Sequence, residues 1–130
     1  MRQGRPLALV TAGLLLWAAS PVRAGALTSE VDGIRVELTS SPSRPGTNGQ
    51  TEYVVRLVDG TGRAVTGAQV TLRGGMADGM SVVAPLRPAK EPGMYRGRVL
   101  FTMEGRWELT LRIASDKRRF ELPLTEHVGR

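Results

Sequence analysis

Short runs of alternating apolar and polar residues recur through the chain between clusters of Gly, Pro, Asn, Asp and Ser. In the first run, Ile34, Val36 and Leu38 alternate with polar residues. Because a β-strand turns successive side chains to opposite faces, each run gives a strand with one buried face. The other runs lie within residues 51–58, 63–75, 80–88, 92–115 and 118–124. We expect an all-β fold, a single antiparallel immunoglobulin-like β-sandwich of about seven strands.

The longest of these runs, residues 92–115, predicts a β-hairpin. A three-residue loop at residues 104–106 would pair Met103 with Trp107 and would keep every inward pair of the hairpin apolar. Met103 is therefore expected in the core, where its thioether would pack against the Trp107 ring. The same register places Val99 opposite Leu111.

The sequence PGMY, residues 92–95, places a glycine two positions before a tyrosine at the start of this hairpin. This spacing is typical of a tyrosine corner, in which the phenol hydroxyl bonds to backbone upstream and fixes a crossover loop. We therefore expect Tyr95 to have a structural role.

The N-terminus has the pattern of an export signal. Two arginines precede a charge-free run over residues 7–19, which is followed by small residues. This run is shorter than the roughly 20 apolar residues of a membrane span. We expect a signal peptide at 1–24, cleaved after Ala24, and a periplasmic location; if the signal is not cleaved, it is an N-terminal membrane anchor.

The mature chain is then expected to contain one domain at 33–125, between a flexible N-terminus at 25–32 and a loose tail at 126–130. No later hydrophobic run is long enough for a membrane span, so the mature protein is expected to be soluble. The chain has no cysteine, which excludes disulfides and a lipid-attached N-terminal cysteine.

Charge and motif content exclude several classes of function. The chain has 18 basic and 12 acidic residues, and removal of three arginines with the signal peptide leaves 15 basic residues and a net charge of +3. That charge is too low to indicate a nucleic-acid partner. The sequence has no cysteine nucleophile, no serine in a recognisable catalytic arrangement, no paired carboxylates and no phosphate-binding loop. We therefore do not expect an enzyme.

Two segments carry a family resemblance. DGTGRAVTGAQVTLRGGM, residues 59–76, and GMYRGRVLFTMEGRWELTLRI, residues 93–113, resemble the YtkA-like family of small exported bacterial domains. The resemblance implies an immunoglobulin-like β-sandwich without an established catalytic activity. It also points towards metal delivery, because some relatives occur in copper-handling or oxidase-assembly settings and have closely spaced methionines in the bend after residue 73.

Met76 and Met80 lie in this glycine-rich bend and are the candidate metal ligands. Thioether sulfur is a soft ligand that suits Cu(I) and needs no deprotonation. Two sulfurs form a weak site, and Met94, which is expected to face outward beside the tyrosine corner, is the candidate third ligand. The alternative is that both methionines simply cover one end of the sandwich. The single histidine, His127, is expected to be solvated in the tail.

Arg96, Arg98 and Arg112 are candidate partner-binding residues. The hairpin register sets Arg98 opposite Arg112, and like charges in that arrangement cost stability. Either Glu121 or Glu108 neutralises them, or the arginines form a basic strip for an acidic protein or an anionic lipid.

The function we expect is that of an exported, non-catalytic binding module, in its more specific version a copper-handling accessory protein or chaperone. The alternative is a metal-free structural or interaction domain of a cell-envelope complex. An envelope protein partner is expected under both readings, and Cu(I) is the single cofactor considered.

Overall fold

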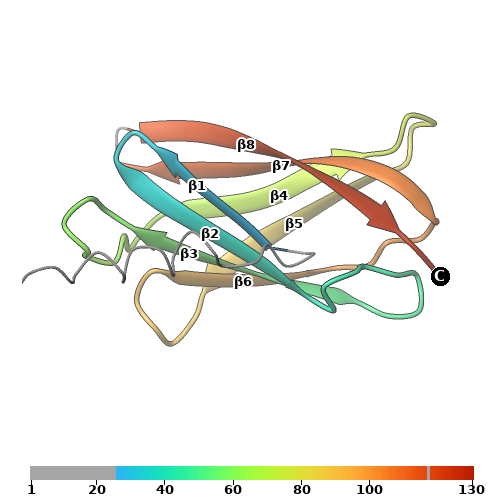
Figure 1. Cartoon of the computed structure of the whole chain (residues 1–130), viewed down its shortest axis with the longest axis horizontal. Helices are drawn as coiled ribbons and strands as arrows, with labels where there is room; N and C mark the ends of the chain where they lie inside the picture. The colour runs from blue at the N-terminus through green and yellow to red at the C-terminus, as the bar shows by residue number, and fades with distance from the viewer. Residues whose placement is uncertain (1–25, 117) are drawn as a thin grey trace, which may run out of the picture.

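The computed structural model describes residues 26–116 and 118–130, in which eight β-strands form one antiparallel sheet (Figure 1). The signal peptide expected at 1–24 lies outside the described residues. The strands are β1 (Ala26–Val31), β2 (Ile34–Ser41), β3 (Thr51–Val58), β4 (Gln69–Gly75), β5 (Ser81–Pro88), β6 (Met94–Val99), β7 (Gly105–Ser115) and β8 (Arg118–Val128). Within these ranges, no helix is long and apolar enough to cross a membrane.

The strand order is β1-β2-β3-β6-β5-β4-β7-β8. Strand β5 joins the two halves, because it pairs with β4 along its length and with β6 at Arg87 and Pro88. The all-β antiparallel prediction is confirmed. However, eight strands form a continuous, barrel-like sheet instead of a sandwich of two separate sheets with about seven strands.

The core lies inside this curved sheet and consists of inward-facing residues of β2 to β8 together with Ala68 and Phe101 from the connections. Trp107, Tyr53, Tyr95 and Phe101 are the largest fully buried side chains. The Phe101 and Trp107 rings meet edge to face with centroids 5.1 Å apart, a geometry that adds about 0.5–1.5 kcal/mol to the burial of their area. These residues link the crossover after β6 to the start of β7.

The N-terminal segment expected to be flexible at 25–32 is instead strand β1, which pairs with β2 from Ala26 to Val31. The two-residue turn Asp32–Gly33 connects these strands, and both residues have positive φ angles, of 51° and 79°. An Asp-Gly pair between two such runs is a strong hairpin signal. The sequence therefore contained the evidence for this strand.

The tail expected to be loose at 126–130 is also ordered in part. Strand β8 continues to Val128 and pairs with β7 down to Gly105. The side chains of Glu126 and Val128 are 7% and 4% exposed. A charged residue at an inward position concealed the continuation of the strand.

The hairpin predicted within residues 92–115 is wrong. Strand β6 pairs with β3 and β5, whereas β7 pairs with β4 and β8. Residues 100–104 leave the strand conformation and cross between the two halves of the sheet. The alternation of inward and outward side chains in β6 therefore does not carry over into β7. As a result Val99 lies opposite Thr51, and Met103 is 42% exposed instead of buried in the core.

The tyrosine corner is confirmed. Tyr95 Oη donates a 2.8 Å hydrogen bond to the Val65 carbonyl and accepts a 3.2 Å bond from the Ala68 backbone N–H. Both partners belong to the connection between β3 and β4. This connection is thereby fixed to the start of β6 at one end of the molecule.

Candidate functional site

Met76 and Met80 face each other across the turn between β4 and β5. The Met76 backbone N–H donates a 2.8 Å hydrogen bond to the Met80 carbonyl. This bond extends the pairing of β4 with β5 by one residue pair beyond Gly75 and Ser81. Side chains directly opposite in an antiparallel pair lie on the same face, with Cβ atoms about 5 Å apart. The structure therefore brings these two predicted ligands together.

Met103 lies at the same end of the molecule. A Cβ atom built on Gly105 would lie 2.6 Å from Met76 Cε, so the Met76 side chain rests on the backbone two residues after Met103. The Met103 carbonyl accepts a 3.0 Å hydrogen bond from Trp107 Nε1, which fixes the loop to the core. We call this end of the molecule, with Met76, Met80 and the nearby Met103, the methionine end.

Met94 does not lie at the methionine end. It begins β6 opposite Arg56, and its carbonyl accepts a hydrogen bond from the Ala89 N–H just after β5. The full length of β5, eight residues, separates the Met80 turn from this point (Figure 1). At about 3.3 Å per residue that separation is about 25 Å. Met94 therefore does not share a site with Met76 and Met80.

The surroundings of the methionine end are short of other metal ligands. His127 lies on the outward face of β8 opposite Arg106, in an ordered strand and not in a loose tail. Among the described residues, no three His, Asp or Glu side chains group in a way that could hold a metal ion. Met76 and Met80 line a groove of about 330 Å³ that Arg73 also lines. A cation at this end would therefore rely on thioether sulfur.

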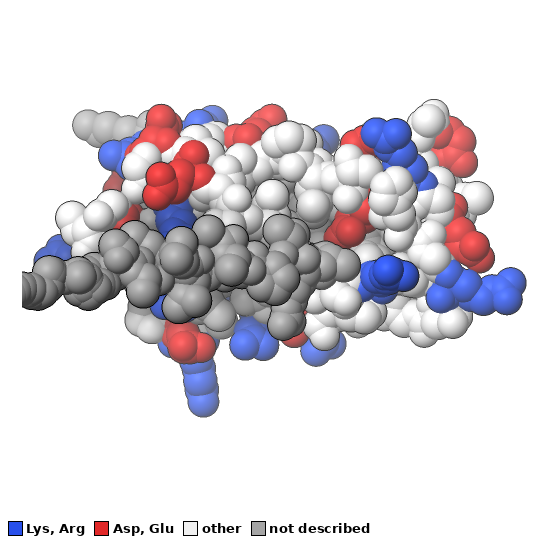
Figure 2. Space-filling view, in the orientation of Figure 1, with Lys and Arg blue, Asp and Glu red and all other residues white. Residues whose placement is uncertain are grey.

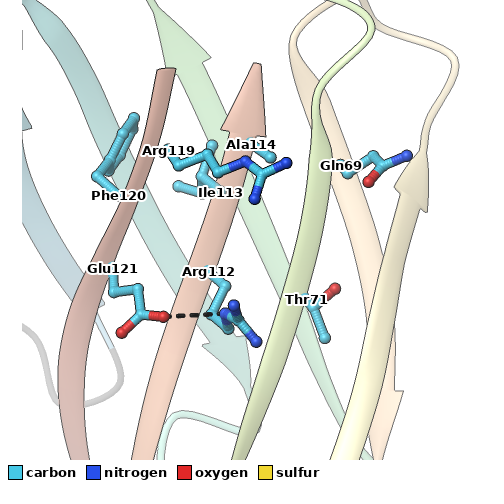
Figure 3. Close-up of a pocket in the computed structure, with 8 residues that line it drawn as sticks. All are labelled: Gln69, Thr71, Arg112, Ile113, Ala114, Arg119, Phe120 and Glu121. Atoms are coloured by element: carbon cyan, nitrogen blue, oxygen red, sulfur yellow. Dashed lines mark ion pairs between the residues drawn. The ribbon is translucent and has the colours of Figure 1, made fainter. Parts of the chain in front are cut away.

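A larger groove of about 720 Å³ runs over the outer face of β4, β7 and β8 (Figure 3). Thr71 and Gln69 line it from β4, and the Arg119 side chain extends from β8 across β7. Arg112 forms an ion pair with Glu121 at 2.9 Å. Sequence reasoning missed this groove, because its residues come together through strand pairing alone.

The three predicted partner-binding arginines are not one strip. Arg96 and Arg98 lie on the outer face of β6, whereas Arg112 lies on β7. Arg98 is opposite Glu52, so the like-charge pair expected between Arg98 and Arg112 is absent. The neutralisation expected from Glu121 is present as the ion pair with Arg112.

Elsewhere on the surface the charges are mixed. On the face that Figure 2 shows, acidic and basic side chains are interspersed without a large patch of one sign. Glu108 illustrates the pattern, because it accepts hydrogen bonds from Thr125 and Arg106. The Thr125 bond is the main reason that the pKa of Glu108 lies below its usual value.

Glu126 differs from these surface carboxylates because it is buried. Tyr53 Oη donates a 2.7 Å hydrogen bond to Glu126 Oε2. Burial raises the pKa of Glu126, against the opposing effects of the Tyr53 bond and of nearby His127. Burial is also the main reason that the pKa of Tyr53 is raised. Because this pair faces the core, we assign it a structural role.

Together these features define a small antiparallel β domain whose distinctive surfaces are a methionine end, a shallow polar groove and exposed arginines. The chain belongs to the YtkA-like family, whose model matches residues 28–112. The resemblance seen in the sequence is thus confirmed, and the match begins within β1. Neither this family nor the structural relative below indicates a catalytic activity.

One solved structure with the same fold is a DUF4426 family protein from Pseudomonas aeruginosa. It superposes with a TM-score of 0.60 over 81% of this chain and 95% of its own, at 14% sequence identity. At that identity the likeness shows the fold alone. No curated protein matches the sequence.

Proposed function

We propose that this protein is an exported, non-catalytic binding module that holds Cu(I) at the methionine end. The observation that carries the proposal is the placement of Met76 and Met80 across one turn, with the Met76 methyl group against Gly105 and Met103 two residues away. Three of the methionines therefore come from two connections that meet at one end of the molecule.

The donor set suits a soft, monovalent ion. Thioether sulfurs bind Cu(I) without losing a proton and do not form disulfides in an oxidising compartment. Harder divalent ions prefer oxygen ligands, and Asp78 is the one acid inside the turn. Its Oδ1 accepts a hydrogen bond from the Met80 N–H at 3.2 Å, so the carboxylate helps to shape the turn.

Export rests on the residue pattern of 1–24, with cleavage after Ala24 and a periplasmic location. N-terminal sequencing of the protein purified from whole cells and from a periplasmic extract tests this part. A periplasmic product that begins at Gly25 supports it, whereas an intact N-terminus in the membrane fraction favours an anchor.

The second candidate function is a metal-free interaction domain of an envelope complex. The partial burial of Met76 and Met80 against the core favours it, since apolar packing alone accounts for a cap over the end of the sheet. Arg73 in the same groove also opposes cation binding. The two candidates differ in whether the sulfurs bind anything.

Titration of the purified protein with Cu(I) against a competing chelator separates these candidates. We expect tight binding that is lost when Met76 and Met80 are both changed to leucine, and weakened by Met103→Leu. Met94→Leu is the matched control, because it removes one thioether about 25 Å away by the rise of β5. Equal affinity in the wild type and the double variant would exclude the copper function and favour the metal-free domain.

A further inference from the structure

Three adjacent strands, β4, β5 and β6, contain no acidic residue. Their outward side chains include four exposed arginines, Arg73, Arg87, Arg96 and Arg98, which we call the arginine face. Among the described residues Arg73, Arg87 and Arg98 have no ion pair, and Arg96 has one, with Glu52 of β3. This face is therefore the most uniformly basic part of the sheet.

Arg87 and Arg96 are directly opposite each other in the pairing of β5 with β6. Like charges at directly opposed positions destabilise an antiparallel pair. One carboxylate offsets them, because Glu52 on β3 lies 3.8 Å from Arg96. Arg87 receives no such compensation from the described residues, so this arrangement is unfavourable in the isolated domain.

The arginine face is accessible to a large partner. Val83 lies on β5, the middle strand of the three, opposite Arg73, with 67% of its surface exposed. Pro85 follows on the same face of β5, and β5 lies between β6 and β4 in the strand order. Binding here would consequently use side chains on the face of the sheet.

We propose that the arginine face docks an acidic surface of a partner protein. Guanidinium groups pair with carboxylates in a planar, two-bonded geometry, and within the chain Arg96 already has the Glu52 carboxylate 3.8 Å away as its ion-pair partner. A partner carboxylate placed between Arg87 and Arg96 would relieve their repulsion. This inference does not depend on copper binding.

Titration of the isotope-labelled full chain with poly-L-glutamate, followed by amide NMR shifts, tests the proposal. We expect shifts to concentrate on β4, β5 and β6 and to fade with added salt. Arg87→Gln combined with Arg98→Gln should weaken binding about fivefold or more, as expected for the loss of two exposed charge contacts. Arg44→Gln with Arg63→Gln removes the same charge elsewhere and is the matched control.

The controls also decide against the proposal if it is wrong. Equally weakened poly-L-glutamate binding in both double variants, or amide shifts near all exposed arginines, would overturn the proposal. Binding would then depend on the net charge of the protein and not on this face. Binding to phosphatidylglycerol vesicles through this face, without binding to poly-L-glutamate, would overturn it in favour of a membrane surface. The amide spectrum reports whether each variant is folded. If the double variant does not fold, Arg98→Gln alone is tested in its place.

Discussion

Tyr53 and Glu126 form a buried hydrogen bond of 2.7 Å that joins β3 to β8 through the core. Their side chains are 1% and 7% exposed. β3 and β8 lie in opposite halves of the strand order, so the bond links two parts of the sheet that do not pair. It therefore helps to hold the two halves of the curved sheet together.

Removal of the Tyr53 hydroxyl should destabilise the domain. Tyr53→Phe leaves the Glu126 carboxyl buried without its donor, and an unsatisfied buried polar group costs about 1–3 kcal/mol. The free energy of unfolding in urea measures the loss. If the variant is as stable as the wild type, the bond contributes nothing net and another group must satisfy Glu126.

Glu126 should also make stability depend on pH. Burial raises its pKa above the ordinary 4.5, so the folded state holds this proton at pH values where the unfolded state has released it. The contribution is fully present below the ordinary value and is lost as pH rises through the folded pKa. Relative to the wild type, Glu126→Gln should therefore gain stability as pH rises from about 4 to neutral.

Urea unfolding of both proteins across that range measures the difference. Glu126→Gln keeps an oxygen that accepts the Tyr53 hydrogen bond, so packing is preserved while the titration is removed. Glu108→Gln is the matched control, because the pKa of that exposed carboxyl is lowered and its loss should act in the opposite direction. If the difference in the free energy of unfolding between the wild type and Glu126→Gln is constant with pH, the pKa of Glu126 is not raised.

The sequence indicated the position of Tyr53 but not that of Glu126. Alternation of period two places Tyr53, Val55 and Leu57 on one face, and all three are buried. Glu126 lies on the inward side of β8, but the predicted strand ended at Leu124 and residues 126–130 were expected to form a loose tail. A buried carboxyl needs a partner from another strand, here one 73 residues away. Local patterns carry no information about such a contact.

The tyrosine corner gives a third prediction. Tyr95→Phe removes both hydrogen bonds to the connection between β3 and β4 and leaves the Ala68 N–H, which is in a buried position, without its acceptor. We expect a loss of about 1–3 kcal/mol in the free energy of unfolding. The change keeps the ring, so the near-ultraviolet spectrum of the tryptophan should stay the same. Unchanged stability would show that the corner is dispensable.

The alternation of inward and outward positions gave wrong locations for Met94 and Met103, for a physical reason. The prediction treated residues 92–115 as one hairpin, but residues 100–104 cross between the halves of the sheet and reset which side faces inward. Met103 was therefore assigned to the core and Met94 to the candidate site, whereas the structure places Met103 near Met76 and Met94 at the opposite end. Met76 and Met80 were placed correctly because they flank a single local turn.

The contact between Met76 and Gly105 provides the last prediction. Gly105 has a φ of 131°, which other residues rarely adopt, and an added Cβ would collide with Met76 Cε. Gly105→Ala should cost about 1–3 kcal/mol for the backbone conformation alone, plus a further amount for displacement of the methionine. In the Met76→Ala background no methionine has to be displaced, so Gly105→Ala should lower the free energy of unfolding by less. A double-mutant cycle measured by urea unfolding gives this coupling, and additive effects would place Met76 away from Gly105 in solution.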